Sequence, residues 1–242
     1  MNLMQELILF DPCFPKAAPQ GSSTAIAAAK TPRWWGSSVR QLVMDTLGLL
    51  MPCGSSRNYG QDLEDGLTVA GQYQIETRTL DLAPLKNVAV QQLAAVTELA
   101  PPALTNLAPR LRMTALYAVA ASENRLVAGT GNRSEAYVGY FTKWGDGAHD
   151  FNPISDLTVT EIYEFLRWLN APACVIEKKP SAGLFDGQTD EQELGITYCD
   201  LDAYLSGEAV SSSAKQKIRQ MHEKSEHKRK GIILYPVETL IL

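Results

Sequence analysis

The sequence of 242 residues predicts an α/β protein with a doubly wound, mostly parallel sheet flanked by helices. Three observations predict this fold. Strand-like and helix-like patterns alternate along the chain, the strand-like runs are short and continuously apolar, and a glycine-rich turn joins one of these runs to a helix. Sheets of this kind bind ligands at the carboxyl ends of their strands, so we expect a site in the turns that follow the strands.

The elements are expected in a regular order. The first is a buried strand over Leu47 to Met51, which is apolar and is ended by Pro52 and Gly54. The patterns that follow predict an acidic helix over 62–72, a strand over 74–82, helices over 85–99 and 109–123, and a short apolar strand over 125–128.

Composition narrows the class of protein. The chain is 45% hydrophobic and 20% charged, as is typical of a globular protein with a sizeable core. Its net charge of −5 disfavours general attraction to nucleic acid or to an anionic membrane, and no apolar run approaches the roughly 18 residues of a membrane-spanning helix. The four cysteines are widely spaced and the first residues lack a secretory pattern, so we expect a cytoplasmic protein without structural zinc.

The run LVAGTGNRSEA, Leu126 to Ala136, is the first candidate site. A strand that ends in Gly-Thr-Gly-Asn and opens a helix presents free backbone N–H groups, which favour an anion. Glycines at such a turn are more often structural, so the pattern alone is weak. Glu135 lies one turn into the helix, where a carboxylate either caps the helix or binds Mg²⁺.

The loop YFTKWGDGAHDFNP, Tyr140 to Pro153, is the second candidate site. It combines Lys143, Asp146, His149 and Asp150 with aromatic residues and glycines. Loops of this composition more often contact ligands than pack in a core, although a solvated connection is the alternative.

Four segments, in order, resemble the ammonia-dependent NAD synthetases: GTGNRSE, GYFTKWGDGAHDFNPISDLT, KKPSAGLFDGQTDEQELGITY and SEHKRK. The resemblance runs from residue 47 to residue 230. It implies the adenine-nucleotide α-hydrolase fold, ATP as co-substrate, Mg²⁺ and a homodimer. It also implies a two-step reaction: the carboxylate of deamido-NAD is adenylated by ATP, and ammonia then displaces AMP to give NAD.

The resemblance also assigns roles to individual residues. Thr130 and Ser181 match ATP contacts, and Glu135 matches a Mg²⁺ ligand. The positions that it places around deamido-NAD are Arg110, Tyr117, Lys143, Asp146, Asp150, His227 and Lys228.

Each of these residues also has a structural interpretation. Arg110 could be a solvated helix arginine, Tyr117 a core residue and Ser181 a turn residue. Asp146 could hold the Gly-Asp-Gly turn by bonding its own backbone, and His227 and Lys228 could be part of a solvated basic tail.

Two departures from the family pattern stand out. Val159 occupies a position where many relatives have a lysine that reaches ATP. The pyrophosphate loop S-G-G-x-D-S, which should precede LGLLMPC, is absent. Reading the codons of Ile26 to Gln41 one nucleotide earlier can yield N-S-G-G-K-D-S, so a frame slip in this segment is one explanation and genuine divergence is the other.

We therefore expect three parts: a divergent or frame-disrupted segment over 1–46, an α/β domain over 47–230 and an atypical apolar tail over 231–242. The predicted activity is ATP-dependent amidation of deamido-NAD with ammonia, impaired in this chain if the loop is truly missing. The alternative is a non-catalytic nucleotide-binding homologue or dimerisation partner.

Overall fold

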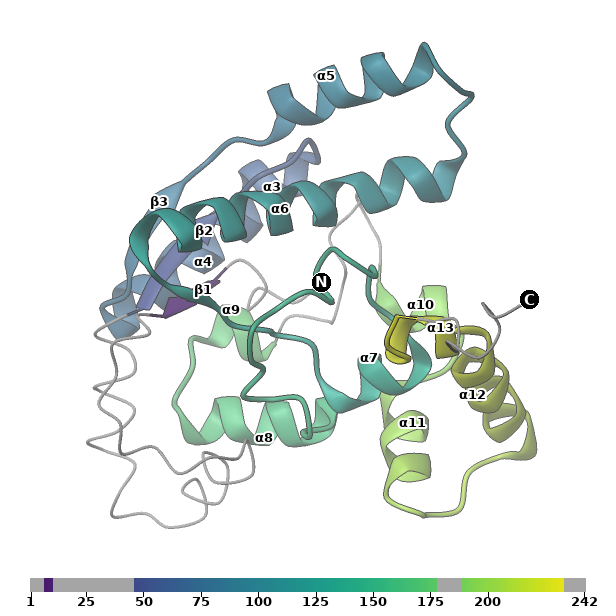
Figure 1. Cartoon of the computed structure of the whole chain (residues 1–242). Coiled ribbons are helices and arrows are strands. Elements are labelled where there is room, and N and C mark those ends of the chain that lie inside the picture. Colours follow the sequence, from purple (N-terminus) through teal and green to yellow (C-terminus); the bar gives the residue numbers. More distant parts are fainter. Residues whose placement is uncertain (1–6, 11–45, 178–188, 233–242) are drawn as a thin grey trace, which may run out of the picture.

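The computed structural model describes residues 7–10, 46–177 and 189–232. Its centre is a four-stranded sheet with the order β3-β2-β1-β4 (Figure 1). The strands are β1 (Leu7–Phe10), β2 (Thr46–Leu50), β3 (Glu76–Thr79) and β4 (Leu126–Val127). The α/β fold class predicted from the sequence is confirmed.

Strand direction decides which turns meet at one edge of the sheet. β2 pairs parallel with β3, whereas β1 pairs antiparallel with both β2 and β4. β2, β3 and β4 therefore share one direction, as expected of a mostly parallel sheet, and β1 alone runs against them among the described strands. Phe10, the last residue of β1, pairs with Thr46 and Leu126, the first residues of β2 and β4. The carboxyl end of β1 thus lies at the edge opposite to the carboxyl ends of the other three.

Helices cover both faces of β2. Because alternate residues of a strand face opposite sides, Leu47, Leu49 and Met51 face one layer and Leu50 faces the other. The first three share a buried core cluster with residues of α6 (Pro101–Glu123). Leu50 lies against Gly66 of α4 (Gln61–Tyr73), where an added Cβ would approach within 2.8 Å of Leu50 Cδ2. Every residue of β2 is buried, which explains its continuous apolar sequence.

Helix α6 is longer than the sequence pattern predicts. The prediction placed its start at Pro109, but the helix begins at Pro101 and encloses Pro109. Proline is favoured in the first turn, where no intrahelical N–H bond is lost, and Pro101 and Pro102 occupy that turn. The helix ends at Asn124, which adopts the left-handed conformation with φ 54°. With α5 (Ala83–Ala94), it forms the helical pair at the top of Figure 1.

Most of the remaining helices form a second layer beyond β4, whereas α3 (Ser56–Tyr59) lies beside α4. A separate core cluster joins Val138, Val159, Leu194, Leu201 and Ile218. The other helices are α7 (Arg133–Val138), α8 (Val159–Trp168), α9 (Ala173–Ile176), α10 (Asp190–Leu194), α11 (Tyr198–Leu205), α12 (Ser212–Lys224) and α13 (Glu226–Arg229). Within the described ranges, no helix is long and apolar enough to cross a membrane.

Helix α7 meets the junction of α12 and α13 at very short range. Gly139 ends α7 in the left-handed conformation, with φ 72°. A Cβ at this position would lie 2.1 Å from Ser225 Cβ, so only glycine allows the two segments to approach this closely.

This contact predicts the effect of Gly139→Ala. The alanine would meet both an unfavourable φ and a steric clash, so we expect the free energy of unfolding to fall by about 3 kcal/mol. Gly207→Ala is the control, because Gly207 has φ 80° but nothing within 4 Å of an added Cβ. That variant should lose only about 1 kcal/mol. Urea denaturation measures both, and equal losses would show that the close approach to Ser225 contributes nothing.

Candidate functional site

The candidate site lies at the carboxyl ends of β2 and β4, under α6. A cavity of about 30 Å³ opens there, lined by Pro109, Arg112, Met113, Leu116, Val127, Ala128, Gly129, Thr130, Gly145, Asp146 and Ala148. Arg112 is buried in its wall, donating from Nε to the Met51 carbonyl (3.0 Å) and from Nη2 to Asn58 Oδ1 (3.2 Å). The cavity joins the two sequence regions predicted to form a site, the glycine turn and the Lys143 to Asp150 loop.

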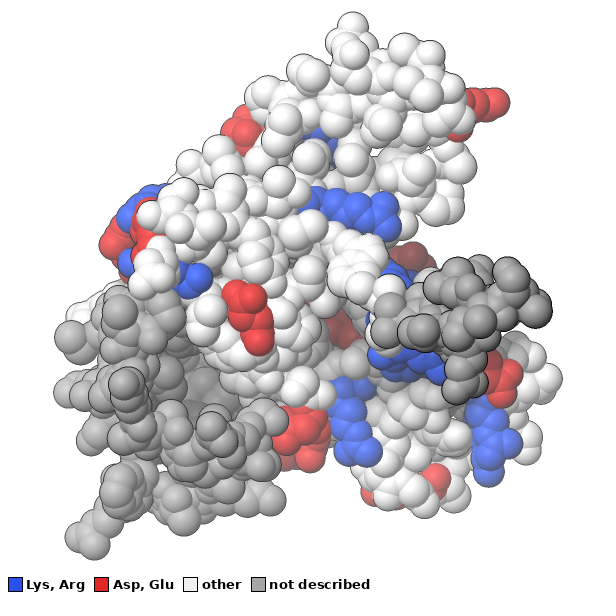
Figure 2. Space-filling view, in the orientation of Figure 1, with Lys and Arg blue, Asp and Glu red and all other residues white. Residues whose placement is uncertain are grey.

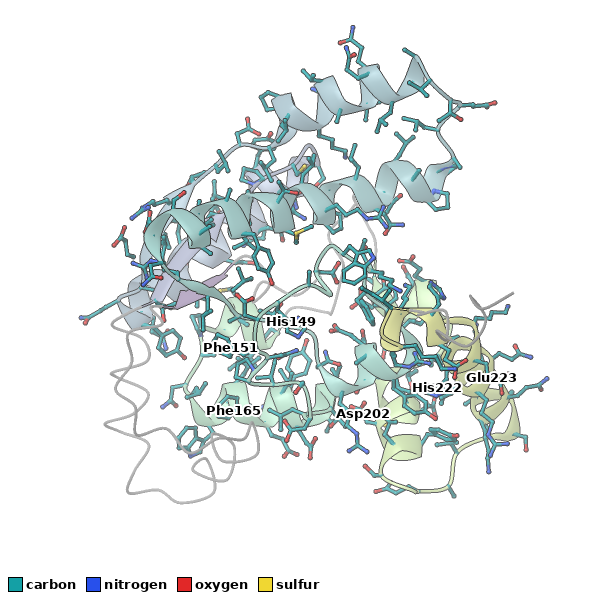
Figure 3. All side chains as sticks on the ribbon, in the orientation of Figure 1. His149, Phe151, Phe165, Asp202, His222 and Glu223 are labelled. Carbon is teal, nitrogen blue, oxygen red and sulfur yellow. The ribbon has the colours of Figure 1, made fainter. Side chains whose placement is uncertain are left out.

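The turn after β4 has the strand-turn-helix form that its sequence predicts. Gly129 packs against the loop, because an added Cβ would lie 2.5 Å from His149 Cγ, and its N–H donates to the Phe151 carbonyl (2.6 Å). His149 and Phe151 are labelled below α6 in Figure 3. Thr130 is buried in the same turn. Gly129 is therefore structural, whereas an added Cβ at Gly131 would meet nothing within 4 Å. Thr130, the predicted ATP contact, lines the cavity.

Asn132 and Glu135 form a capping box at the start of α7. Asn132 Oδ1 accepts the Glu135 N–H (2.9 Å), and Glu135 Oε2 accepts the Asn132 N–H (3.1 Å). Both side chains are buried, and Asn132 Nδ2 has no hydrogen-bond partner among the described residues. Of the two interpretations of Glu135, the capping role is confirmed. It does not exclude metal binding, because Oε1 makes no hydrogen bond to any described residue.

Burial gives Glu135 unusual electrostatics. Loss of solvation raises the pKa of its carboxyl group to about 7, and the negative charges of Asp190 and Asp146 add to this shift. No lysine or arginine among the described residues forms an ion pair with it. A buried carboxylate in negative surroundings is stabilised when a cation binds, so the environment of Glu135 fits a cation. The described part of the chain contains no cluster of three or more metal-ligating side chains, so Glu135 alone does not complete a metal site.

Asp146 holds the turn of its own loop. Its Oδ1 accepts the backbone N–H of Thr142 (3.0 Å), four residues earlier. Burial raises the pKa of this carboxyl group, and the bond to Thr142 opposes the shift. This is the turn-holding role that the sequence analysis left open, and Asp146 also lines the cavity.

Asp150 connects the loop to the sheet and to α6. Its Oδ2 accepts the Val127 N–H of β4 (2.7 Å), and its Oδ1 accepts the hydroxyl of Tyr117 (3.3 Å). Tyr117 packs against the first core cluster, and burial raises the pKa of its hydroxyl. Tyr117 therefore has the core role considered for it, together with a polar contact at the site.

Three of the predicted dinucleotide contacts form a chain of hydrogen bonds. Arg110 of α6 donates from Nε and Nη2 to the Lys143 carbonyl, both at 3.4 Å. Lys143 Nζ in turn donates to the His227 carbonyl of α13 (2.5 Å). The fold thus brings together residues separated by 33 and 84 positions in the sequence.

Lys228 faces backbone carbonyls. Its Nζ donates to Gly139 and to Phe141 at 2.7 Å each, and burial lowers the pKa of its ammonium group. The basic tail is therefore docked on the protein and is not simply solvated.

Two further positions from the sequence analysis are Val159 and Ser181. Val159 is buried in the first turn of α8, where its N–H donates to Ser134 Oγ (3.2 Å). Ser181 lies outside the described residues.

Sequence reasoning missed several residues that shape the site. Arg112 looked only like an interruption of an apolar run. Ser134 and Asp202 are joined by a short hydrogen bond, and Asp202 Oδ2 also accepts the N–H and the hydroxyl of Thr160 (2.8 and 2.7 Å), so it links α7, α8 and α11. Arg229 contacts the end of α7. The motif SEHKRK contains Arg229. No sequence pattern indicates which groups Arg112, Asp202 and Arg229 bind.

The pKa of Glu135 predicts a pH dependence of stability. Its folded-state value, about 7, lies above that of an exposed glutamate, about 4.3. The folded state therefore binds the proton more tightly, so Glu135 contributes stability below pH ~4 that is lost as the pH rises through 7, by up to about 3 kcal/mol. Glu135→Gln should remove this part of the pH dependence while keeping the capping box.

Urea denaturation between pH 5 and pH 8.5 measures the effect as the difference between wild type and Glu135→Gln. Glu161→Gln is the matched control, because Glu161 occupies the same place in the capping box of α8 but is exposed. Parallel pH profiles for wild type and Glu135→Gln would show that the pKa of Glu135 is not raised.

Comparison with known proteins shows which family the chain resembles. A family model described as NAD synthase matches residues 38–231. The NH(3)-dependent NAD(+) synthetase of Carboxydothermus hydrogenoformans is 46% identical over 187 residues, which are 76% of this chain and 76% of that protein. The enzyme of the same name from Mannheimia succiniciproducens is 44% identical over 172 residues, 69% of each chain.

Solved structures agree with these sequence relatives. The NMN synthetase of Francisella tularensis superposes with a TM-score of 0.75 at 37% identity, covering 89% of this chain and 85% of its own. The NH3-dependent NAD synthetase of Campylobacter jejuni superposes with a TM-score of 0.66 at 27% identity, covering 89% and 86%.

Proposed function

Since the chain belongs to the NAD synthase family, we propose that the edge of β2 and β4 is where it binds deamido-NAD and ATP. Its relatives are NH3-dependent NAD⁺ synthetases, and the activity of this family is the ATP-dependent amidation of deamido-NAD with ammonia. The observation that carries the proposal is the hydrogen-bonded chain from Arg110 through Lys143 to His227. We also propose that the chain acts in the cytoplasm, because its four cysteines are widely spaced in the sequence and form no C-x-x-C pair.

The chemistry requires activation of a carboxylate. A carboxylate resists attack by an amine until one oxygen becomes part of a good leaving group. In the first step, the nicotinate carboxylate attacks the α-phosphate of ATP and releases pyrophosphate, which leaves a mixed anhydride with AMP. In the second step, ammonia forms the C–N bond, AMP leaves with the electrons of the C–O bond, and the nitrogen loses a proton.

The proposed roles of the side chains follow their positions. The cation of Arg110 lies against the Lys143 carbonyl and that of Lys143 against the His227 carbonyl, and we assign both to the phosphates of a dinucleotide. Asp150 and Tyr117 lie at the end of β4, between α6 and the loop, where they suit the nicotinate end. Thr130 lines the cavity beside them and suits ATP. Asp146 is assigned to the shape of the loop rather than to direct contact, because Thr142 occupies Oδ1.

Glu135 is the residue that would hold Mg²⁺. Its buried carboxylate, its raised pKa and its unbonded Oε1 support this role, since Mg²⁺ prefers oxygen ligands. When bound, the ion would offset the charge that develops on the phosphates.

The strand order supports the proposal that this chain lacks a phosphate loop. In doubly wound sheets, such a loop follows a strand at the ligand edge. β1 lies between β2 and β4, but it brings its amino end, and not its carboxyl end, to the edge where the other three strands end. The NAD synthase match begins only at residue 38. The segment 11–45, where the frame slip is proposed, lies outside the described residues. Without the loop, several charge-assisted phosphate contacts are lost, each worth roughly 1.5 to 3 kcal/mol.

This chain should therefore bind deamido-NAD without adenylating it at a rate normal for the family. Isothermal titration calorimetry should detect binding of deamido-NAD, and Arg110→Ala should weaken it by about tenfold, a loss of about 1.4 kcal/mol. Arg167→Ala is the control, because Arg167 lies on α8, away from the cavity. Absence of binding in the wild type would contradict the site, and NAD formation at a normal rate would contradict the missing loop.

The Francisella structure raises a second question, which is whether the substrate is a mononucleotide or a dinucleotide. That protein is an NMN synthetase, so a mononucleotide is the second candidate substrate for this chain. The same titration with nicotinate mononucleotide distinguishes the two. Binding much weaker than that of deamido-NAD supports the dinucleotide, because the adenylate half then contributes contacts of its own.

We also propose a homodimer formed through α5 and α6. α5 buries no residue, and apolar side chains on and beside it are exposed, among them Leu85, Val88, Leu93 and Val96. Figure 2 shows mainly uncharged atoms over α5, with a group of Lys or Arg atoms on α6 below it. From residue 83 to residue 109, Lys86 and Glu98 are the only charged residues in the sequence. An apolar surface of this kind is typical of an interface.

The dimer predicts that Val88→Glu is monomeric, because the carboxylate would be buried without a partner. Light scattering at micromolar concentration should report the mass of two chains for the wild type and of one chain for this variant. Trp168→Glu is the control, since Trp168 is equally exposed but lies on α8. A monomeric wild type would contradict the dimer.

A further inference from the structure

The last turn of α7 is capped by an arginine from a distant segment. Arg229 Nη1 donates to the carbonyl of Tyr137 (2.9 Å) and, more weakly, to that of Ala136 (3.4 Å). Both carbonyls lie in the last turn of a helix, where intrahelical donors run out and the helix dipole favours a cation, and the Ala136 carbonyl also accepts the Gly139 N–H (3.3 Å). His222 Nδ1 also contacts the Tyr137 carbonyl (2.8 Å), and its ring stacks on Tyr137 with centroids 4.2 Å apart.

Arg229 also binds its own segment. Its Nη1 donates to Ser225 Oγ (2.6 Å), and its Nη2 makes a short hydrogen bond to the His222 carbonyl. One guanidinium group therefore joins α7 to the junction of α12 and α13, the place where Gly139 and Ser225 approach most closely. Figure 3 shows His222 on α12, beside α7 and α13.

Three cations attach α13 to the rest of the protein: Lys143, Lys228 and Arg229. They differ in whether their hydrogen bonds would have to break when deamido-NAD binds. Lys143 donates to the His227 carbonyl, and Lys228 donates to the carbonyls of Gly139 and Phe141. The proposed function assigns Lys143 to deamido-NAD, and the family resemblance implies the same contact for Lys228, so on binding both ammonium groups must leave these carbonyls. The bonds of Arg229 need not change, because Arg229 has no proposed ligand contact.

We propose that Arg229 is a positioning residue, which keeps α13 attached to α7 while Lys143 and Lys228 exchange backbone carbonyls for the dinucleotide. The proposal rests on the proposed binding of deamido-NAD at this edge. It also explains why an arginine suits the position: its planar group carries five N–H donors and reaches acceptors on both segments, whereas a lysine ammonium has three donors at a single atom.

The test compares binding of two ligands by full-length variants. Arg229→Ala should weaken deamido-NAD binding by about tenfold or more, as loss of supporting contacts around a site does. ATP binding, measured in a separate titration, should change by less than about twofold, because Thr130 and the cavity lie at the other end of α7. Arg229→Lys, which keeps the charge and at most part of the bonding, should lie between wild type and Arg229→Ala.

Arg219→Ala is the matched control. Arg219 lies on α12 but contacts Tyr204 Oη (3.4 Å), not the carbonyls of α7, so this variant should bind deamido-NAD as the wild type does. Circular dichroism establishes that each variant is folded at the temperature of titration. If Arg229→Ala is unfolded there, Arg229→Lys alone decides the question.

The outcomes separate this inference from the proposed function. If the wild type binds no deamido-NAD, both are wrong. If the wild type binds it and the folded Arg229 variants bind it equally well, only the positioning role is wrong. A parallel loss of deamido-NAD and ATP affinity would also overturn the positioning role, since it would indicate a general structural effect.

Discussion

The carboxylate of Glu135, buried at the start of α7 and bonded to the Asn132 N–H, is the interaction on which the candidate site depends. It accepts a backbone N–H that the turn after β4 would otherwise leave unpaired. Burying this acid with no described cation beside it costs solvation free energy. The opposite end of α7 is held by Gly139, Lys228 and Arg229. A helix of only six residues is thereby fixed at both ends by long-range contacts, and these contacts place α13 beside the loop that carries Lys143.

The direction of β1 has a chemical consequence. Three strands send their carboxyl ends to one edge, where Arg112, Thr130 and Asp146 surround the cavity. At the place where a doubly wound sheet would supply a phosphate-binding turn, the described sheet has the amino end of β1 instead. We propose that the part of the site that recognises the dinucleotide is separate from the part that would hold pyrophosphate, and that this chain lacks the second. This separation is why binding and adenylation are expected to differ in this chain.

Much of this fold could be predicted because its signals are local. β2 is buried on both faces and is continuously apolar, and the turn before α7 combines glycines with an asparagine cap, so both were found at nearly their observed bounds. The predicted start of α6, at residue 109, is eight residues late, because the helix continues through an internal proline and its first-turn prolines are Pro101 and Pro102. The partners of Arg229 and Lys228 could not be predicted, since backbone carbonyls about ninety residues away leave no mark on the sequence. The capping role of Glu135 follows from its position three residues after Asn132, whereas its raised pKa depends on burial that appears only in the folded protein.

The most direct test of this account is the Mg²⁺ dependence of pyrophosphate release in a variant that carries S-G-G-K-D-S in place of the corresponding residues of the 26–41 segment. With ATP, deamido-NAD and ammonia present, the account predicts Mg²⁺-dependent pyrophosphate release that is matched by NAD formation. Adding Glu135→Gln to this variant should lower the rate at least about tenfold, because a metal ligand is lost. The account would be contradicted if Glu135→Gln left the Mg²⁺ dependence unchanged, or if the chain without the restored loop already released pyrophosphate at the same rate.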